Sequence, residues 1–128
     1  MDPVADMITR IRNAGAVRKP AVEVRYSALA EAIAKVLARE AWIENAVPQG
    51  KSPQRTIEIT LKYVDGAHRI SGIRRVSHLG KRVYRGWREI RSVRQGYGMS
   101  LISTPQGILS DKEARKKKVG GEVLFEVW

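Results

Sequence analysis

The residues best suited to chemistry lie in a short turn near the C-terminus. Hydroxyl and amide side chains, with a proline and a glycine, stand between two aliphatic runs: Ser103, Thr104, Pro105, Gln106 and Gly107. Such side chains donate and accept hydrogen bonds without carrying charge, which suits them to base edges and ribose hydroxyls. The same residue types also cap and stiffen ordinary turns. Taken alone, these five residues favour the local structural role.

Positive charge is the second feature that bears on function. The 128 residues carry 24 Lys and Arg against 13 Asp and Glu, giving a net charge of +11 and a pI near 10.4. Residues 69–128 hold 14 basic and 5 acidic side chains, whereas residues 1–68 hold 10 and 8. A polyanion is the natural partner of such a chain, and the second half carries most of the excess.

A basic stretch interleaved with aromatic residues precedes the turn. Nine side chains from position 69 to position 94 are basic, and only Glu89 is acidic. Tyr84, Trp87 and Tyr97 lie among or just after them, the composition expected where base stacking joins charge attraction. For Trp87 we favour a place in the core.

The sequence offers little material for catalysis or metal binding. It has no cysteine, which excludes disulfides and thiolate metal sites. His68 and His78 lack partners at the spacing of a metal site or a catalytic triad, so we expect each to be a surface or turn residue. The motifs G-x-S-x-G and G-x-x-x-x-G-K-[ST] are absent, and Gly96 and Gly98 form only half of a dinucleotide fingerprint. We therefore expect no enzyme activity, metal, cofactor or small-molecule substrate.

The composition, 43% hydrophobic and 29% charged, is that of a soluble globular protein. No apolar run approaches the length that spans a bilayer, and Asp2, Asp6, Arg10 and Arg12 interrupt the start of the chain. We expect no membrane partner and no signal peptide, so that the chain stays where it is made.

Two helices are predicted in the first half of the chain. Apolar residues recur at helical spacing after the Asp2 cap until about Gly15, and again after the Ser27 cap. Arg10 and Arg12 lie off the apolar face of the first helix, where they are either solvated or in contact with phosphate.

Strands are predicted where apolar and polar side chains alternate, over residues 20–26, 42–47 and 55–64. Asp65 and Gly66 predict a hairpin turn. Residues 70–76 show helix-like spacing broken by a glycine, so their state stays open.

Residues 77–81 indicate a boundary, which divides the chain into an N-terminal α/β unit, residues 1–76, and a mostly β unit, residues 77–128. In the second unit we expect strands around Tyr84 and on both sides of the 103–107 turn. Trp87 begins a short amphipathic turn of helix.

A short helix and a strand are predicted at the end of the chain. Ser110 and Glu113 have the spacing of a capping box. The helix ends in four cations that complement its dipole or reach phosphates: Arg115, Lys116, Lys117 and Lys118. Residues 122–128 then alternate as a last strand.

Motifs along essentially the whole chain resemble, in order, the eighth family of bacterial-type small-subunit ribosomal proteins. They are D-P-V-A-D-M-I-T-R-I-R-N-A (residues 2–14), T-L-K-Y (60–63), R-R-V-S (74–77), R-V-Y (82–84), R-E-I (88–90) and I-S-T-P-Q-G-I-L-S-D-K-E-A-R-K-K-K-V-G-G-E-V-L-F-E-V-W (102–128). The last of these is the most specific.

The resemblance implies an α+β fold of two small domains, an N-terminal α-β-α-β-β unit and a C-terminal β-rich unit with a short helix. It implies a structural constituent of the small ribosomal subunit, in the cytoplasm or in an organelle. The protein would bind the central domain of small-subunit ribosomal RNA as a primary binder, support its assembly and lie beside other small-subunit proteins.

The resemblance also implies which residues meet RNA. In the family the turn enters an irregular RNA core, a role that falls to Ser103, Thr104, Gln106 and Gly107. Tyr84 matches an aromatic residue near the RNA. Gly121 and Glu122 match the end of the site, where a carboxylate accepts from a base amino group.

Arg10 and Arg12 match a helix that lies against a second ribosomal RNA segment. The other expected RNA contacts are Pro105 in the turn and basic side chains around it: Arg82, Lys112, Arg115, Lys116 and Lys117.

Three places depart from the family pattern. Pro105 stands where the family usually has serine, so the turn lacks one hydroxyl and one backbone N–H. The sequence His78-Leu79-Gly80 replaces the usual K-P-G, and Arg91 replaces a proline.

Two other binding roles stay open. A translational repressor could bind its own messenger RNA through the same surface. A DNA-binding role is favoured by net charge alone, since no helix-turn-helix or paired zinc ligands are recognisable.

Overall fold

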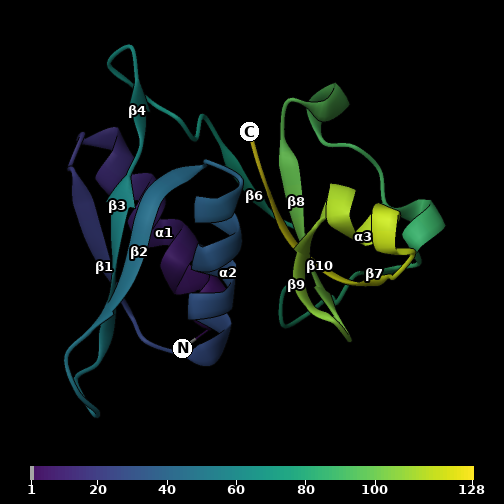
Figure 1. Cartoon of the computed structure of the whole chain (residues 1–128), viewed down its shortest axis with the longest axis horizontal. Coiled ribbons are helices and arrows are strands. Elements are labelled where there is room, and N and C mark those ends of the chain that lie inside the picture. The colour runs from purple at the N-terminus through teal and green to yellow at the C-terminus, as the bar shows by residue number, and fades with distance from the viewer. Residues whose placement is uncertain (1) are drawn as a thin grey trace. The chain divides into compact units, whose positions relative to one another are not determined.

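The computed structural model describes residues 2–128, which form two compact units, residues 2–70 and Ser71–Trp128 (Figure 1). The expected α+β class and the α-β-α-β-β order of the first unit are confirmed. The division falls before the boundary expected between residues 76 and 77. Strand β6 (Ile73–Arg75) pairs with β10 (Gly121–Val127), so it belongs to the second unit.

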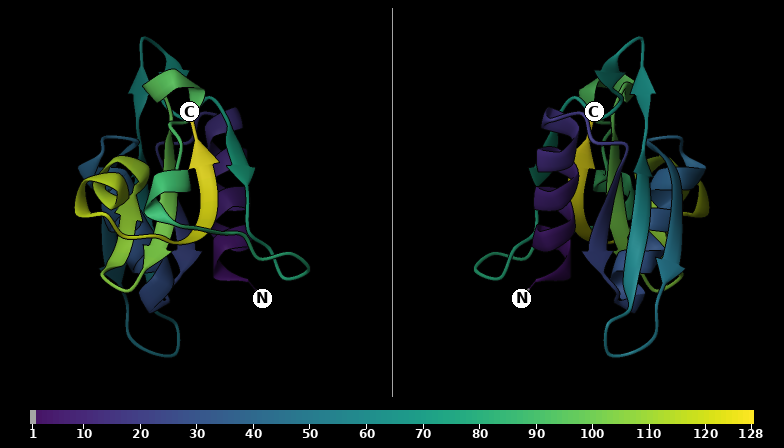
Figure 2. Two further views of the ribbon diagram at one scale, coloured as in Figure 1. Left: turned by 90° about the vertical axis from the view of Figure 1, so that its right-hand side faces the viewer. Right: turned by 90° about the vertical axis from the view of Figure 1, so that its left-hand side faces the viewer.

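The N-terminal unit is a three-stranded antiparallel sheet with two helices on one face, and the sheet faces the viewer in the right-hand view of Figure 2. The strands lie in the order β1-β3-β2. Its elements are α1 (Pro3–Ala16), β1 (Ala21–Arg25), α2 (Ala28–Arg39), β2 (Ile43–Gln49) and β3 (Thr56–Leu61).

Both helices begin at the residues that the sequence predicts. The Asp2 carboxylate accepts from the Val4 N–H at 2.9 Å, and the Ser27 hydroxyl accepts from the Ala30 N–H at 3.0 Å. Each cap satisfies a backbone donor that lacks a partner inside the helix. The apolar faces of the helices and of β3 are buried: Met7, Ile11, Ile33, Leu37, Ile57 and Ile59.

The strand predicted over residues 55–64 is divided at Lys62. Strand β3 ends at Leu61, and β4 (Tyr63–Val64) forms a separate hairpin with β5 (Ala67–His68). The predicted turn between them is confirmed, with Asp65 at φ 51° and Gly66 at φ 81°. These left-handed conformations are those that Asp-Gly adopts most readily.

The expectation that His68 is a surface or turn residue is wrong. His68 is half-buried in β5, with its ring against Gly15 of α1 and 5.5 Å from the Tyr63 ring. Its Nε2 atom is buried and has no hydrogen-bond partner among residues 2–128. Burial lowers the pKa of the imidazole. His78, in contrast, is exposed in a turn.

The C-terminal unit is built around β10, which has β8 on one side and both β6 and β7 on the other. Its remaining elements are β7 (Tyr84–Arg85), β8 (Met99–Thr104), β9 (Gly107–Ser110) and α3 (Asp111–Lys117), with single 3-10 turns at Trp87–Glu89 and Arg94–Gly96. The core beneath α3 consists of Ile90, Ile102, Leu109, Ala114 and Val123.

Trp128 ties the end of β10 into this unit. Its carbonyl accepts from the backbone N–H of Ser71 at 2.6 Å and of Gly72 at 3.0 Å. The Arg94 guanidinium lies 4.2 Å from the centroid of its ring. The expected anchoring of the last strand is therefore observed.

Candidate nucleic-acid interface

Three of the expected RNA-binding residues lie side by side in the C-terminal sheet. Ser103 on β8 is directly opposite Glu122 on β10, and Glu122 is directly opposite Tyr84 on β7. Directly opposite residues of antiparallel strands point to the same face. Tyr84, Glu122 and Ser103 thus form one row, which we call the Ser103 row.

The Ser103 row combines three different binding chemistries. Tyr84 is 65% exposed and offers an aromatic face. Glu122 offers a carboxylate that is 15% exposed. Ser103 is half-buried, and its hydroxyl has no hydrogen-bond partner in the described part of the chain. The row can therefore stack on a base, accept from an amino group and hydrogen-bond a third polar atom.

The predicted turn between β8 and β9 is present, and Thr104 holds its shape. The Thr104 hydroxyl donates to the Gly107 carbonyl at 2.8 Å and accepts from the Gln106 N–H at 3.0 Å. Gly107 has φ +103°, a conformation that favours glycine. Pro105 and Gln106 lie exposed at the tip. Thr104 therefore shapes the turn, and its contact with RNA stays a prediction.

The double glycine lets three backbones approach closely. A Cβ atom on Gly121 would overlap the Ser103 carbonyl oxygen, and one on Gly120 would overlap the Arg85 carbonyl oxygen. Strand β10 can begin between β7 and β8 only because neither residue has a side chain. Gly121 thus lets β10 lie close enough to β8 for Glu122 to face Ser103.

Arg82 lies beside the row and holds its carboxylate. Its NH1 atom is 3.1 Å from Oε2 of Glu122. The Arg82 side chain remains 49% exposed. Two residues that the sequence predicted as separate RNA contacts therefore form one pair.

Helix α3 carries the predicted basic residues, and the structure divides them. The capping box of Ser110 and Glu113 is confirmed. Lys112, Lys116 and Lys117 are exposed. Arg115 instead bonds within the unit, 3.1 Å from Oδ2 of Asp111 and 3.4 Å from the Ile90 carbonyl. Arg115 is thus bonded within the unit with 31% of its side chain exposed, and its contact with RNA stays a prediction.

Arg10 and Arg12 belong to the other unit. Both are exposed on α1, and Arg10 pairs with Asp6 at 2.9 Å. Arg10 and Arg12 therefore lie in the N-terminal unit, whereas the Ser103 row lies in the C-terminal unit.

Trp87 is half-exposed, so the core position that we favoured for it is wrong. The Arg88 guanidinium lies 5.1 Å from its ring centroid, and the Lys118 ammonium lies 5.8 Å away. Cations over an aromatic face are favourable contacts that need no burial in the core.

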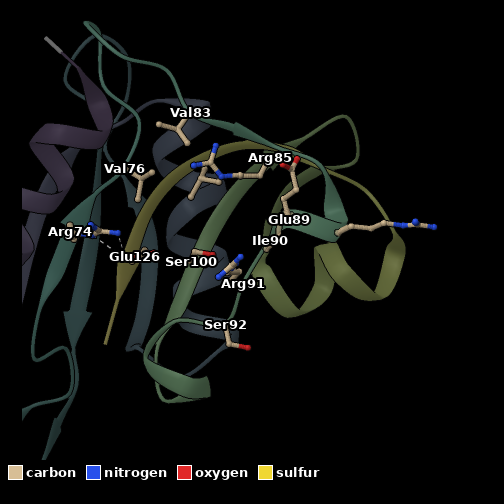
Figure 3. A pocket seen from close by; sticks show the side chains of 12 residues that line it. Arg74, Val76, Val83, Arg85, Glu89, Ile90, Arg91, Ser92, Ser100 and Glu126 are labelled. Atoms are coloured by element: carbon tan, nitrogen blue, oxygen red, sulfur yellow. Dashed lines mark hydrogen bonds and ion pairs between the residues drawn. The ribbon is translucent and has the colours of Figure 1, made fainter.

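A pocket in the C-terminal unit was missed by sequence reasoning. It has a volume of about 600 Å³ and is lined by four arginines, two glutamates and two serines (Figure 3): Arg74, Arg85, Arg88, Arg91, Glu89, Glu126, Ser92 and Ser100. In the sequence, only the basic stretch from position 69 to position 94 pointed to this pocket. The rest depends on strand pairing, because Arg74 and Ser100 both lie opposite Glu126 of β10.

Within residues 2–128 no group of three or more His, Asp or Glu side chains is arranged to hold a metal ion. No helix in the same range is both long enough and apolar enough to cross a bilayer.

Comparison with known proteins places the sequence in a family. The sequence profile of ribosomal protein S8 matches residues 2–128. The small ribosomal subunit protein uS8 of Rubrobacter xylanophilus is 47% identical over 128 residues, which cover 99% of this chain and 97% of the relative. The uS8 of Persephonella marina is 48% identical over 133 residues, covering 99% and 98%. The uS8 of Acidithiobacillus ferrooxidans is 48% identical over 126 residues, covering 98% and 96%. The chain therefore belongs to the ribosomal protein S8 family, a family of non-enzymatic structural proteins.

Proposed function

We propose that this protein is a structural constituent of the small ribosomal subunit that binds the central domain of its ribosomal RNA. It would act there as a primary binder that supports assembly beside other small-subunit proteins of a cytoplasmic ribosome. The observation that carries the proposal is the Ser103 row, which brings Tyr84, Glu122 and Ser103 together from three strands.

The chemistry of the row favours irregular RNA over a regular duplex. A regular RNA helix hides its base edges in a narrow major groove, so specific readers use unstacked bases and 2′-hydroxyls. Tyr84 can stack on such a base, while Glu122 and Ser103 bond to its edge or to a ribose. None of the three contributes positive charge, so the row supplies specificity more than affinity.

Affinity would come from exposed cations of the same unit. Exposed Lys112, Lys116 and Lys117 on α3 and half-exposed Arg82 can each neutralise a phosphate. Arg10 and Arg12 on α1 would meet a second RNA segment. Pro105 removes a donor from the tip of the turn, so recognition in the turn depends on Ser103, Thr104, Gln106 and Gly107.

A salt titration tests the proposal. The intact protein is titrated with a central-domain fragment of small-subunit ribosomal RNA, an RNA duplex of equal length and a DNA duplex. We expect the fragment to bind roughly a thousandfold more tightly than either duplex and to keep this lead as salt rises. Equal affinities that fall together with salt would leave only non-specific attraction and would refute the proposal.

A further inference from the structure

The pocket of Figure 3 lies on the other face of the C-terminal sheet from the Ser103 row. Its floor is a second row of directly opposite residues, Ser100 on β8, Glu126 on β10 and Arg74 on β6. Ser100 is three positions from Ser103, and side chains alternate along a strand, so the two serines point to opposite faces. The proposed function uses this second face only through the exposed lysines of α3, which packs over Ile102 and Val123.

Both carboxylates of the pocket are satisfied inside the chain. Oε1 of Glu126 lies 3.0 Å from NH2 and 3.1 Å from Nε of Arg74. Oε1 of Glu89 accepts from the Gly86 N–H at 3.1 Å. Within residues 2–128 neither acid is bonded to Arg85 or Arg91.

Within residues 2–128 three arginines of the pocket keep unpaired donors: Arg88, whose guanidinium lies against the Trp87 ring, Arg85 and Arg91. Arg91 makes no hydrogen bond or ion pair within residues 2–128. Arg85 donates from NH1 to the Tyr84 carbonyl at 3.0 Å and keeps its other donors. In Figure 3 the Arg91 side chain lies beside Ser100, and the Arg85 guanidinium lies nearer Val83. Planar guanidinium forks match the paired oxygens of an anion.

Strand β7 connects the pocket with the Ser103 row. Among the strands of residues 2–128 it pairs with β10 alone, so no other described strand covers its outer edge. Its two residues point to opposite faces, Tyr84 towards the Ser103 row and Arg85 towards the pocket. One polyanion that passes around this edge contacts both faces, which favours RNA over a separate acidic protein segment.

We propose that Arg85 and Arg91 bind a backbone phosphate of RNA in this pocket, so that RNA is held on both faces of the C-terminal sheet around β7. This inference rests on the proposed function, because the same RNA would contact the Ser103 row.

The first test is the salt dependence of binding to the central-domain fragment. The double variant Arg85→Gln/Arg91→Gln should bind the fragment more weakly and lower the slope of log K against log salt by about one. The matched control Lys35→Gln/Lys51→Gln removes two exposed cations of the N-terminal unit. We expect it to leave the slope unchanged. Equal loss in both variants, or no loss in the arginine variant, overturns the inference.

The second test locates the RNA directly. The chain has no cysteine, so Ser92→Cys at the pocket or Gln106→Cys at the turn gives a single attachment point for an iron chelate that cleaves nearby RNA. We expect the two probes to cleave the bound fragment at different nucleotides.

The outcomes separate this inference from the proposed function. Cleavage from position 106 without cleavage from position 92 overturns the pocket while RNA binding by the turn stands. If the fragment is not preferred over the duplexes, the proposed function fails first, and the inference fails with it. An arginine variant that keeps its RNA slope but loses a small-subunit protein in reconstitution assigns the pocket to an acidic protein segment and also overturns the inference.

Discussion

The Arg82 guanidinium and the Glu122 carboxylate form an ion pair, with NH1 3.1 Å from Oε2. The carboxylate is mostly covered, while half of the arginine side chain is exposed. Arg82 therefore holds one oxygen of this acceptor in place. A base amino group that reaches Glu122 must share this carboxylate with Arg82 or displace it.

A double-mutant cycle measures this dependence. Arg82→Gln and Glu122→Gln should each weaken binding to the central-domain fragment, and the double variant should lose less than the sum of the single losses. We expect a coupling energy of about 0.5–3 kcal/mol, the range for residues in contact. The stability of the free protein should change by less than about 1 kcal/mol, since the pair is partly exposed. Strictly additive losses would show that Arg82 does not position Glu122.

Specificity and affinity should separate between the Ser103 row and α3. Ser103→Ala removes a neutral donor and acceptor, so it should cost about 1–3 kcal/mol of discrimination for the fragment and leave the salt slope unchanged. Lys117→Ala removes an exposed cation, so it should weaken all RNAs about equally and lower the slope by about one. Titrations of both variants with the fragment and the duplex check this. The assignment of base reading to Ser103 is wrong if both variants behave alike.

The close approach of β10 to β8 at Gly121 can be tested by substitution. In Gly121→Ala the added methyl group meets the Ser103 carbonyl, so β10 must move away from β8. We expect a loss of about 1–3 kcal/mol in the free energy of unfolding, the usual cost of overpacking, and weaker binding of the fragment. Urea unfolding gives the first value.

Gly80→Ala is the matched control for this substitution. Its methyl group would find only Nδ1 of His78, 4.0 Å away, so the change should stay within about 0.5 kcal/mol. A Gly121→Ala protein as stable as the control would mean that β10 does not need the glycine.

The helix starts were predictable because the residues that determine them are close in sequence. The caps at Asp2, Ser27 and Ser110 each bind a backbone N–H two or three residues away, and all three helices start as predicted. The turn at Asp65 and Gly66 is equally local.

The site was not predictable in this way. Nothing in the local pattern places Tyr84 beside Glu122 or Glu122 beside Ser103, because register between distant strands depends on the whole sheet. Only the resemblance indicated that the three act together. The state of residues 70–76 was open for the same reason, since their strand exists through pairing with β10.

Histidine positions also depend on tertiary contacts. Spacing alone indicated an exposed His68, yet the hairpin of β4 and β5 brings its ring against Gly15. A histidine without partners in sequence can still be enclosed by glycine and tyrosine from elsewhere in the chain.

The enclosed His68 makes the stability of the protein depend on pH. Burial lowers the pKa of its imidazole in the folded state, and the buried Nε2 has no acceptor within residues 2–128 for a second proton. The unfolded chain therefore binds this proton more readily than the folded chain. The contribution of neutral His68 is fully present above the unfolded pKa of about 6.5 and is lost as pH falls below it. One proton allows a slope of at most about 1.4 kcal/mol per pH unit, which levels off below the folded-state pKa.

Urea unfolding from about pH 7.5 to about pH 5 measures this decline, and two variants identify its source. His68→Gln removes the enclosed imidazole, so it should flatten the pH dependence even where it lowers stability throughout. His78→Gln removes the exposed histidine and should keep the decline of the parent protein. A parent protein that is equally stable across this range, or a His68→Gln variant that declines as steeply as the parent, would show that the enclosed ring accepts its proton without cost. Carboxylates also titrate towards the lower end of the range, but both variants share them, so the difference between the two curves reports the histidine alone.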